Sequence, residues 1–488
     1  MTRPPDRPSR RHVLSGAAGL ALLSQLPGCG GDGGAGTGPG EVGAPDTAAS
    51  DAPAFVPDGP LPNLLFVFGD AHRANALGCY GNGAVRSPRF DAFAAEGVQL
   101  DTAVSSTPLC RPYRAALMSG RFGFNNGMVA NISPHNFGVV DLDDWTPGQW
   151  RPPPGPTFGG TFAAAGYRCG YVGKWHLGPP NIDPGLMRHG FDDSWAASTV
   201  FTHDYYKWNY FTDARQKVSG GGFFRPRMEA DLVLDFAAQD DPRPWMCMLS
   251  WGPPHEPLEP PEEFKKNYRG VAAPPDVPAD LEKRAGKKTR LYYALVEALD
   301  VEFGRLLDEL EARGLAENTI VVYTSDHGTM LGAQGLLGKE VPYSPSTQVP
   351  FLLRWPGGLP AGRRVAMPFG TPDILPTLAG LCGLPVPDGV DGGDFSGVLR
   401  GDAGAPTQDA VLLSSPDCRP VPFPGWRGVR TESVLYARQE GGPWLLFDTA
   451  ADPWELDDLT MKRPELRDEM DARLAQLMDE HGDAWRPT

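Results

Sequence analysis

Leu64-Leu65-Phe66-Val67-Phe68-Gly69-Asp70 is an apolar run that ends in a glycine and an acid. Because no polar residue interrupts the run, it predicts a β-strand that is buried on both faces, as in a sheet covered by helices on both sides. In open α/β sheets, ligands bind beyond the carboxyl ends of the strands. Asp70 therefore stands where we expect a functional residue.

A second stretch repeats this arrangement. Thr319-Ile320-Val321-Val322-Tyr323-Thr324 predicts another buried strand, and Ser325-Asp326-His327 follows it directly. A helix is predicted before this strand, from about Thr289 to Arg313, because leucines recur there at three- and four-residue spacing. Helices and strands alternate over 61–400, which predicts an α/β domain with a mixed, mostly parallel sheet flanked by helices. Two strand ends would then bring Asp70 and Asp326 together.

The pattern changes after about residue 400. Residues 426–438 and 444–448 predict strands of a small antiparallel sheet, and residues 464–481 predict a closing helix. We therefore expect a C-terminal subdomain over 401–488, after the larger α/β domain over 61–400.

The 488-residue chain has a formal net charge of −16 and 41% hydrophobic residues. This composition is typical of a globular protein. The negative charge argues against a nucleic-acid partner and against an anionic membrane surface, since both need clustered lysine and arginine. The seven cysteines show no C-x-x-C pairing, so a zinc site is not expected. Most of them are expected to be buried, and one disulfide among the later ones stays open.

The N-terminus predicts a targeting signal. Ser9-Arg10-Arg11-His12-Val13-Leu14 resembles a twin-arginine export signal, an apolar run follows it, and Leu26-Pro27-Gly28-Cys29 resembles a bacterial lipobox. We expect a signal peptide over 1–28, a lipid anchor on Cys29 and a flexible tether over 29–60. The mature protein would be an exported lipoprotein of the periplasm or cell surface that touches the membrane through that anchor.

Cys110-Arg111-Pro112-Tyr113-Arg114 is the stretch that points to a chemistry, and Leu117-Met118-Ser119-Gly120-Arg121 follows it closely. Its cysteine, proline and arginine resemble the C-x-P-x-R core of the sulfatase family, and the Leu-Met-Ser-Gly-Arg segment resembles the rest of that signature. In that family a maturation enzyme oxidises the cysteine to Cα-formylglycine, an aldehyde whose hydrate is the nucleophile. The resemblance therefore implies formylglycine at Cys110 and a formylglycine-generating enzyme as a partner.

Five further segments resemble sulfatase motifs in the family's order along the chain. They are Pro62 to Asn82, Gly173-Lys174-Trp175-His176-Leu177-Gly178, Pro253-Pro254-His255-Glu256-Pro257, Ser325-Asp326-His327-Gly328 with Gly338-Lys339, and Phe447 to Leu456. A single motif match is weak evidence, whereas six in one order are specific. The resemblance covers the chain from about Leu61 to the C-terminus, and it implies an alkaline-phosphatase-like fold.

The resemblance also implies a divalent metal and a set of catalytic residues. The metal, Ca²⁺ or in some relatives Mg²⁺, would be bound by Asp70, the oxidised Cys110, Asp326 and His327. The catalytic residues would be Cys110, Arg114, Lys174, His176, His255 and Lys339. Lys174 and Lys339 would hold the sulfate oxygens, and His255 would contact the substrate and protonate the leaving alcohol. Arg114 would stabilise the hydrated formylglycine, and His176 would hydrogen-bond one of its hydroxyls.

One position departs from the family pattern. The residue after the first acid is usually a second Asp or a Gln, which adds a metal ligand, but this chain has Ala71. A water or another residue must then complete the ligand shell, and His72 is a candidate.

Three functions are compatible with these residues. The first is hydrolysis of a sulfate ester, on a carbohydrate or a small alcohol, by formylglycine with a divalent metal. The second is hydrolysis of a phosphonate monoester or phosphodiester, because such relatives share the same core and the same cations would hold a phosphoryl group. The third is a non-catalytic lipoprotein that binds a sulfated glycan. Aromatic residues over 122–156 and 195–211 are expected near the pocket mouth, where they would stack on sugar rings or simply pack.

Overall fold

The computed structural model describes residues 60–131, 155–178, 188–198, 204–212, 217–415 and 425–485. The predicted signal peptide, the lipidation site at Cys29 and the predicted tether up to residue 59 lie outside these ranges, so they stay predictions. Among the helices within these ranges, none combines the length and the hydropathy that crossing a membrane requires.

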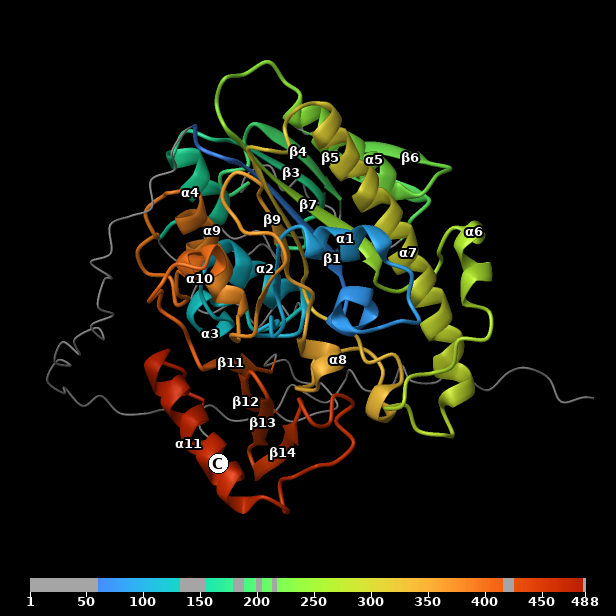
Figure 1. Ribbon diagram of the computed structural model, residues 1–488, viewed down its shortest axis with the longest axis vertical. Helices are drawn as coiled ribbons and strands as arrows, with labels where there is room; N and C mark the ends of the chain where they lie inside the picture. Colours follow the sequence, from blue (N-terminus) through green and yellow to red (C-terminus); the bar gives the residue numbers. More distant parts are fainter. Residues whose placement is uncertain are drawn as a thin grey trace, which may run out of the picture. The chain divides into compact units, whose positions relative to one another are not determined.

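A ten-stranded sheet organises most of the described chain (Figure 1), with the strand order β10-β2-β9-β8-β1-β7-β3-β4-β5-β6. Its strands are β1 (Asn63–Asp70), β2 (Val98–Leu100), β3 (Arg168–Lys174), β4 (Ser194–Ser198), β5 (Lys207–Thr212), β6 (Lys217–Gly221), β7 (Trp245–Pro254), β8 (Thr319–Ser325), β9 (Leu352–Arg354) and β10 (Arg363–Val365). The central strands β8, β1, β7, β3 and β4 run parallel, whereas β9 and the β5–β6 ribbon pair antiparallel. The predicted mixed, mostly parallel sheet is confirmed.

Helices cover both faces of this sheet (Figure 1), because its central strands are apolar on both sides. Along β1, Leu64, Phe66 and Phe68 belong to one core, while Leu65 and Val67 belong to the other. The first core is closed by α2 (Cys110–Ser119), α4 (Phe158–Ala164), α9 (Ile374–Leu381) and α10 (Ser396–Arg400), and the second by α1 (Pro88–Ala95), α5 (Arg225–Ala237) and α7 (Glu282–Ala312). The short helices are α3 (Gly123–Asn126), α6 (Glu262–Lys265) and α8 (Ser344–Thr347).

Helix α7 is longer than the sequence predicts. It begins at Glu282 instead of about Thr289, and it ends at Ala312, shortly before Gly314 takes a left-handed φ of 68°. Its first two turns contain Lys, Glu and Arg, which have good helix propensity, and Ala285 is buried there. The helix therefore starts before its leucine periodicity does.

A second, four-stranded antiparallel sheet follows in the C-terminal part. Its strands are β11 (Ala410–Ser414), β12 (Trp426–Thr431), β13 (Val434–Gln439) and β14 (Gly442–Asp448), and α11 (Pro464–Glu480) shares a core with them. The segment 426–438, which predicts strand throughout, is divided by a hairpin turn in which Val434 N–H donates to Thr431 Oγ1 at 2.9 Å. The turn contains no glycine, proline or asparagine, and Ser433 is its single, weaker turn signal.

The five cysteines within the described ranges form no disulfide with one another. They are Cys79, Cys110, Cys169, Cys247 and Cys382, and all but Cys79 are buried, as expected. Cys418 lies outside the described residues.

Candidate active site

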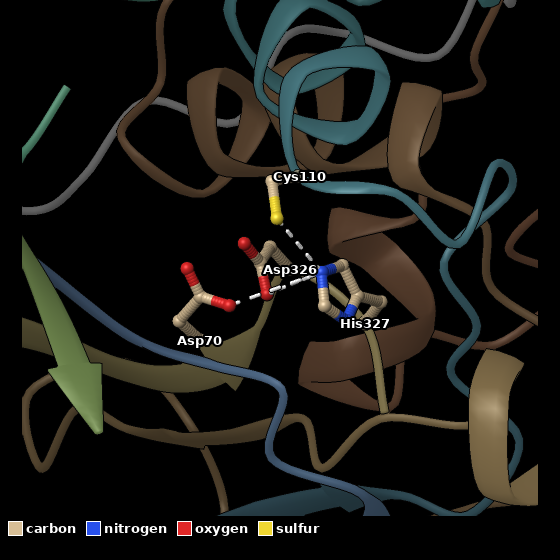
Figure 2. Close-up of side chains that lie close together, drawn as sticks. All are labelled: Asp70, Cys110, Asp326 and His327. Atoms are coloured by element: carbon tan, nitrogen blue, oxygen red, sulfur yellow. Dashed lines mark hydrogen bonds and ion pairs between the residues drawn. The ribbon is translucent and has the colours of Figure 1, made fainter. Parts of the chain in front are cut away.

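Three elements bring the four predicted metal ligands together (Figure 2). Asp70 ends β1, Asp326 and His327 follow β8, and Cys110 begins α2. One ligand atom from each residue lies within 4.8 Å of the other three, and all four side chains are buried. His327 Nε2 is the central atom: it lies 3.2 Å from Cys110 Sγ, 3.8 Å from Asp70 Oδ1 and 3.6 Å from Asp326 Oδ1.

The parallel pairing of β1 with β8 sets this geometry. Gly69 pairs with Ser325 where the two strands end. The Gly69 carbonyl oxygen accepts hydrogen bonds from Asp326 N–H at 3.2 Å and from Ser325 Oγ at 3.0 Å. Because parallel strands end at the same edge of a sheet, Asp70 and Asp326 become neighbours, as the sequence predicts.

The four residues fit a divalent metal ion. Carboxylate oxygens, which Asp70 and Asp326 supply, are the ligands that Ca²⁺ and Mg²⁺ prefer. Asp70 Oδ1 is buried and has no hydrogen-bond partner among the described residues, and such an unpaired buried oxygen is costly. An ion among these atoms would satisfy it. Cys110 is present as the unmodified residue, so its Sγ stands for the position of an oxygen of hydrated formylglycine.

Two cations are buried beside the acids. Lys174 Nζ forms an ion pair with Asp70 Oδ2. Arg114, in α2, donates from Nη2 to Asp326 Oδ2 at 3.0 Å and lies 3.5 Å from Asp70 Oδ2. Its Nη1 donates to the Lys174 carbonyl oxygen at 2.7 Å and to Ser250 Oγ at 2.8 Å. Although burial raises the pKa of Asp70, Lys174 and further cations hold it well below its usual value, so the acid stays ionised.

Lys339 contacts both Cys110 and His255. Lys339 Nζ is 3.3 Å from Cys110 Sγ and 3.3 Å from His255 Nε2. His255 Nδ1–H donates to the Glu256 carbonyl oxygen at 2.6 Å, so Nε2 is the nitrogen that can exchange a proton with a ligand. Burial lowers the pKa of His255, and the nearby lysines lower it further. A bound anion would raise this pKa again and charge the ring.

His176 is buried just beyond β3 and has a left-handed φ of 60°. Burial, with the charge of Lys174, lowers the pKa of His176 to about 3, while a hydrogen bond with Cys110 acts in the opposite direction. The ring is therefore neutral near pH 7 and can accept a proton from a hydroxyl at position 110.

The electrostatics of position 110 favour an anion. Burial and Asp70 raise the pKa of Cys110, but Lys174, Lys339 and His327 outweigh them and hold it well below its usual value. A position that stabilises a thiolate also stabilises a nucleophilic oxyanion or a sulfate oxygen, because the same cations act on each.

His72 does not complete the metal shell, which corrects one expectation. Its Nδ1 is 2.7 Å from the Tyr323 hydroxyl, and its ring packs edge-on against Phe90, Tyr292 and Tyr323 in the core. Burial lowers the pKa of His72 to about 3. The side chain is therefore a neutral core residue, outside the four-residue cluster.

Ala71 supports the site through its backbone. Its φ of 65° is left-handed, and its N–H donates to Asp326 Oδ1 at 3.1 Å. Its carbonyl oxygen accepts from the Tyr292 hydroxyl at 2.7 Å. Because the alanine side chain offers no ligand atom, a bound metal would rely on water to complete its shell.

Two residues of the site are absent from the sequence prediction. Ser250 in β7 holds Arg114, and Tyr292 in α7 holds Ala71. The signal for Ser250 was a hydroxyl inside an otherwise apolar strand. Tyr292 gave no comparable signal, because an aromatic residue on an amphipathic helix is ordinary core.

Most of the aromatic residues expected at the pocket mouth are buried where the structure describes them, whereas Phe124, Tyr206 and Phe211 are half-buried. Trp195, Tyr205, Trp208 and Tyr210 are all buried. The segment 132–154, with Trp145 and Trp150, lies outside the described residues.

The site combines two acids at strand ends, a cysteine at a helix start between them and flanking lysines. This combination defines the class of protein. It is an alkaline-phosphatase-like α/β hydrolase of anionic esters. The family model for sulfatases matches residues 62–384, and the model for the C-terminal part of N-sulphoglucosamine sulphohydrolase matches residues 332–480. The chain belongs to the sulfatase family, which hydrolyses sulfuric esters.

Individual relatives agree with this assignment. The chain is 35% identical over 441 residues to an ulvan-active sulfatase of Formosa agariphila, covering 87% of this chain and 82% of the relative. It is 28% identical over 495 residues to an endo-4-O-sulfatase of Bacteroides thetaiotaomicron, covering 87% and 93%. A solved structure from work on glycosaminoglycan metabolism by Bacteroides thetaiotaomicron matches with a TM-score of 0.77 and 26% identity, covering 87% of this chain and 97% of that one.

Proposed function

We propose that this protein hydrolyses a sulfate ester on a carbohydrate, with formylglycine formed from Cys110 as nucleophile and Ca²⁺ or Mg²⁺ as metal. The observation that carries the proposal is the setting of Cys110, whose Sγ lies 3.2 Å from His327 Nε2 and 3.3 Å from Lys339 Nζ beside the two acids. The names of the relatives, which refer to ulvan and to glycosaminoglycan metabolism, support a carbohydrate substrate.

A divalent metal and formylglycine would have distinct roles in this proposal. Asp70, Asp326, His327 and position 110 would hold the metal, which would polarise a sulfate oxygen as a Lewis acid. Formylglycine at position 110 would supply a hydrated aldehyde, whose hydroxyls would serve as the nucleophile and as the group that releases sulfate.

The residues of the chain supply binding and proton transfer. Lys174 and Lys339 flank position 110 and hold the sulfate oxygens. Arg114 fixes both acids, so it keeps the ligand cluster in place as charge shifts during the reaction. The neutral His176 accepts a hydroxyl proton at position 110. His255, once the bound anion has raised its pKa, donates a proton from Nε2 to the leaving alcohol.

The test begins with protein produced beside a formylglycine-generating enzyme. Mass spectrometry of the peptide spanning Cys110 should show a loss of about 18 Da, the change from thiol to aldehyde. That protein should release sulfate from sulfated carbohydrates in the presence of Ca²⁺, and the matched Cys110→Ala variant should not. An unmodified thiol in active protein would refute the nucleophile, and a large preference for an aryl phosphonate over an aryl sulfate would favour the phosphonate hydrolase instead.

We further propose that the protein is exported and anchored through lipid on Cys29. The twin-arginine pattern and the lipobox-like Leu26-Pro27-Gly28-Cys29 support this. Globomycin, which blocks lipoprotein signal cleavage, should make the uncleaved precursor accumulate in a bacterial host, whereas unchanged processing would contradict the anchor.

A further inference from the structure

A cavity of about 180 Å³ opens beside the reaction centre, and His255 and Lys339 form part of its wall. Because His255 protonates the leaving alcohol in the proposed function, the leaving group of the ester must lie in this cavity. The cavity is smaller than the roughly 300–1,000 Å³ that encloses a drug-sized ligand. It therefore has room for one small unit, and a longer chain would continue outside it.

An ion pair forms another part of the cavity wall. Lys288 of α7 donates to Glu256 Oε1 at 2.6 Å, and both residues line the cavity. The Lys288 side chain is 26% exposed and that of Glu256 is 54% exposed, so both can reach a ligand. The Glu256 carbonyl oxygen also accepts a hydrogen bond from His255 Nδ1–H. This bond holds the Glu256–Lys288 ion pair directly beside the proton donor.

The charges of this wall select the kind of group that it can bind. Lys339 is committed to the sulfate and His255 to the leaving oxygen, so the charged side chains left among the cavity-lining residues are Glu256 and Lys288, which cancel. A hydroxyl group can donate to the carboxylate and accept from the ammonium group. A second sulfate or a carboxylate can only accept, so it could not bond to the Glu256 carboxylate, and the neutralised pair would offer it no net attraction.

Apolar side chains also line the cavity. Leu258 and Leu337 line the same cavity, and Leu337 is 52% exposed although it is a large hydrophobic residue. A sugar ring offers hydroxyls at its rim and C–H groups on its faces, so it matches an ion pair beside two leucines.

We propose that Glu256 and Lys288 form a subsite for hydroxyl groups of the sugar unit that carries the sulfate, and that this unit bears no second anionic group. The inference rests on the proposed sulfatase function and narrows its substrate to monosulfated sugar units. Glu256 accepts from one hydroxyl and Lys288 donates to a neighbouring one, while Leu258 and Leu337 contact the ring.

The test compares substrates with and without sugar hydroxyls on formylglycine-bearing protein. The variants Lys288→Met and Glu256→Gln keep side-chain size, and Lys265→Met and Glu262→Gln are matched controls, since Lys265 and Glu262 form an exposed ion pair at 2.7 Å on α6. The substrates are 4-nitrophenyl sulfate, a panel of methyl hexoside monosulfates, and a disulfate of whichever hexoside reacts fastest. Thermal melting checks that each variant is folded.

Lys288→Met and Glu256→Gln should each lower kcat/KM on the best hexoside monosulfate about 10- to 100-fold, the range for losing a hydrogen bond to a charged group. They should change 4-nitrophenyl sulfate hydrolysis by less than about twofold, and the control variants should change neither rate. The desulfated hexoside should inhibit the wild type on 4-nitrophenyl sulfate more strongly than it inhibits either variant.

Several results would overturn the subsite. The subsite would be contradicted if the variants lost equal activity on both substrates, or if they lost none on the hexoside. It would also be contradicted if the wild type preferred the disulfate and Lys288→Met abolished that preference. Hydrolysis of 4-nitrophenyl sulfate without hydrolysis of any hexoside would refute the subsite and leave the sulfatase chemistry standing. A wild type that releases sulfate from no substrate would refute the proposed function itself.

Discussion

At the scale of single residues, His255 is the group whose charge changes in the proposed mechanism. Replacing His255 with Asn removes the proton donor and keeps a polar side chain. We expect kcat/KM on a sugar sulfate to fall about 10²- to 10⁴-fold, which is the usual contribution of a general acid to the rate. The loss on 4-nitrophenyl sulfate should be much smaller, because nitrophenolate leaves without a proton. Equal losses on the two substrates would show that His255 only binds sulfate.

The pH dependence of the wild type provides a second test of His255. Burial lowers the pKa of this histidine in the free protein, and a histidine loses its proton as pH rises. The acid-competent fraction therefore disappears above a pH that is lower than the ordinary histidine value of about 6.5. We expect kcat/KM on a sugar sulfate to fall as pH rises through that point, and we expect the His255→Asn profile to lack this limb.

Ala71 offers a way to test the metal site through its backbone strain. An L-residue in the left-handed region is strained by roughly 1–2 kcal/mol, and Gly, Asn and Asp are the residues that tolerate it. Ala71→Gly relieves the strain without adding a ligand, whereas Ala71→Asp also adds an oxygen. We expect Ca²⁺ to raise the melting temperature of Ala71→Asp more than that of Ala71→Gly, because a tighter Kd stabilises the folded state.

The comparison of Ala71→Asp with Ala71→Gly is made with and without EDTA. The two variants should melt at similar temperatures in EDTA and separate when Ca²⁺ is added. Identical Ca²⁺ shifts would mean that a side chain at position 71 cannot reach the ion.

The sequence was sufficient to predict that two strand-end acids lie side by side. Asp70 and Asp326 could be placed together because each follows a buried strand, and parallel strands end at one edge. His72 could not be placed, because sequence does not say to which side a residue just beyond a strand turns its ring. Lys288 could not be predicted as a site residue either, because the sequence shows it as one of many charged residues on an exposed helix. The packing of α7 is what brings Lys288 Nζ within 2.6 Å of Glu256 Oε1.

At the scale of elements, α1 is capped by a residue far away in sequence. The Asp300 carboxylate of α7 accepts hydrogen bonds from the backbone N–H groups of Arg89 and Phe90, both at 2.9 Å. Ser87, at the start of the helix, forms no capping hydrogen bond with its side chain. A sequence pattern cannot reveal such a cap, since ordinary capping residues are local. Asp300 therefore joins two helices that cover the same face of the sheet.

Removing this cap should loosen α1. Asp300→Ala leaves two N–H groups without their acceptor, at a cost of about 1–3 kcal/mol, and Asp300→Asn should lose less because it keeps an acceptor oxygen. The matched control is Asp308→Ala on the same helix, which breaks an exposed ion pair with Arg89 and should cost below about 1 kcal/mol. Urea unfolding measures all three, and an Asp300→Ala midpoint equal to that of Asp308→Ala would contradict the cap.

At the scale of the whole molecule, one buried acid ties the C-terminal part to the catalytic part. Glu455 lies in the connection after β14. Its two carboxylate oxygens accept a hydrogen bond from Ser344 N–H at 3.1 and 3.0 Å, and one of them also accepts from the Ser344 hydroxyl. Gln334 donates to the Trp454 and Glu455 carbonyl oxygens at 3.0 and 2.9 Å. The backbone and side chain of this connection thus hold α8 and the segment around Gln334, which follows His327 in sequence.

The charge of Glu455 should make stability depend on pH. Burial raises the pKa of Glu455 from its ordinary value near 4.5 to about 7. Between these values the folded protein binds the proton and the unfolded chain does not, so the free energy of unfolding falls as pH rises. The full difference amounts to about 3 kcal/mol.

Glu455→Gln is uncharged at every pH, so it should lack this contribution, whereas the exposed Glu432→Gln should follow the wild type. Denaturant unfolding from pH 5 to pH 8 should therefore show the wild type losing about 3 kcal/mol relative to Glu455→Gln. The loss must appear on the alkaline side, because a buried acid with a raised pKa is destabilising only once it ionises. Parallel stability curves for the two proteins would mean that Glu455 is ionised throughout this range and that Ser344 and Arg430 compensate its charge.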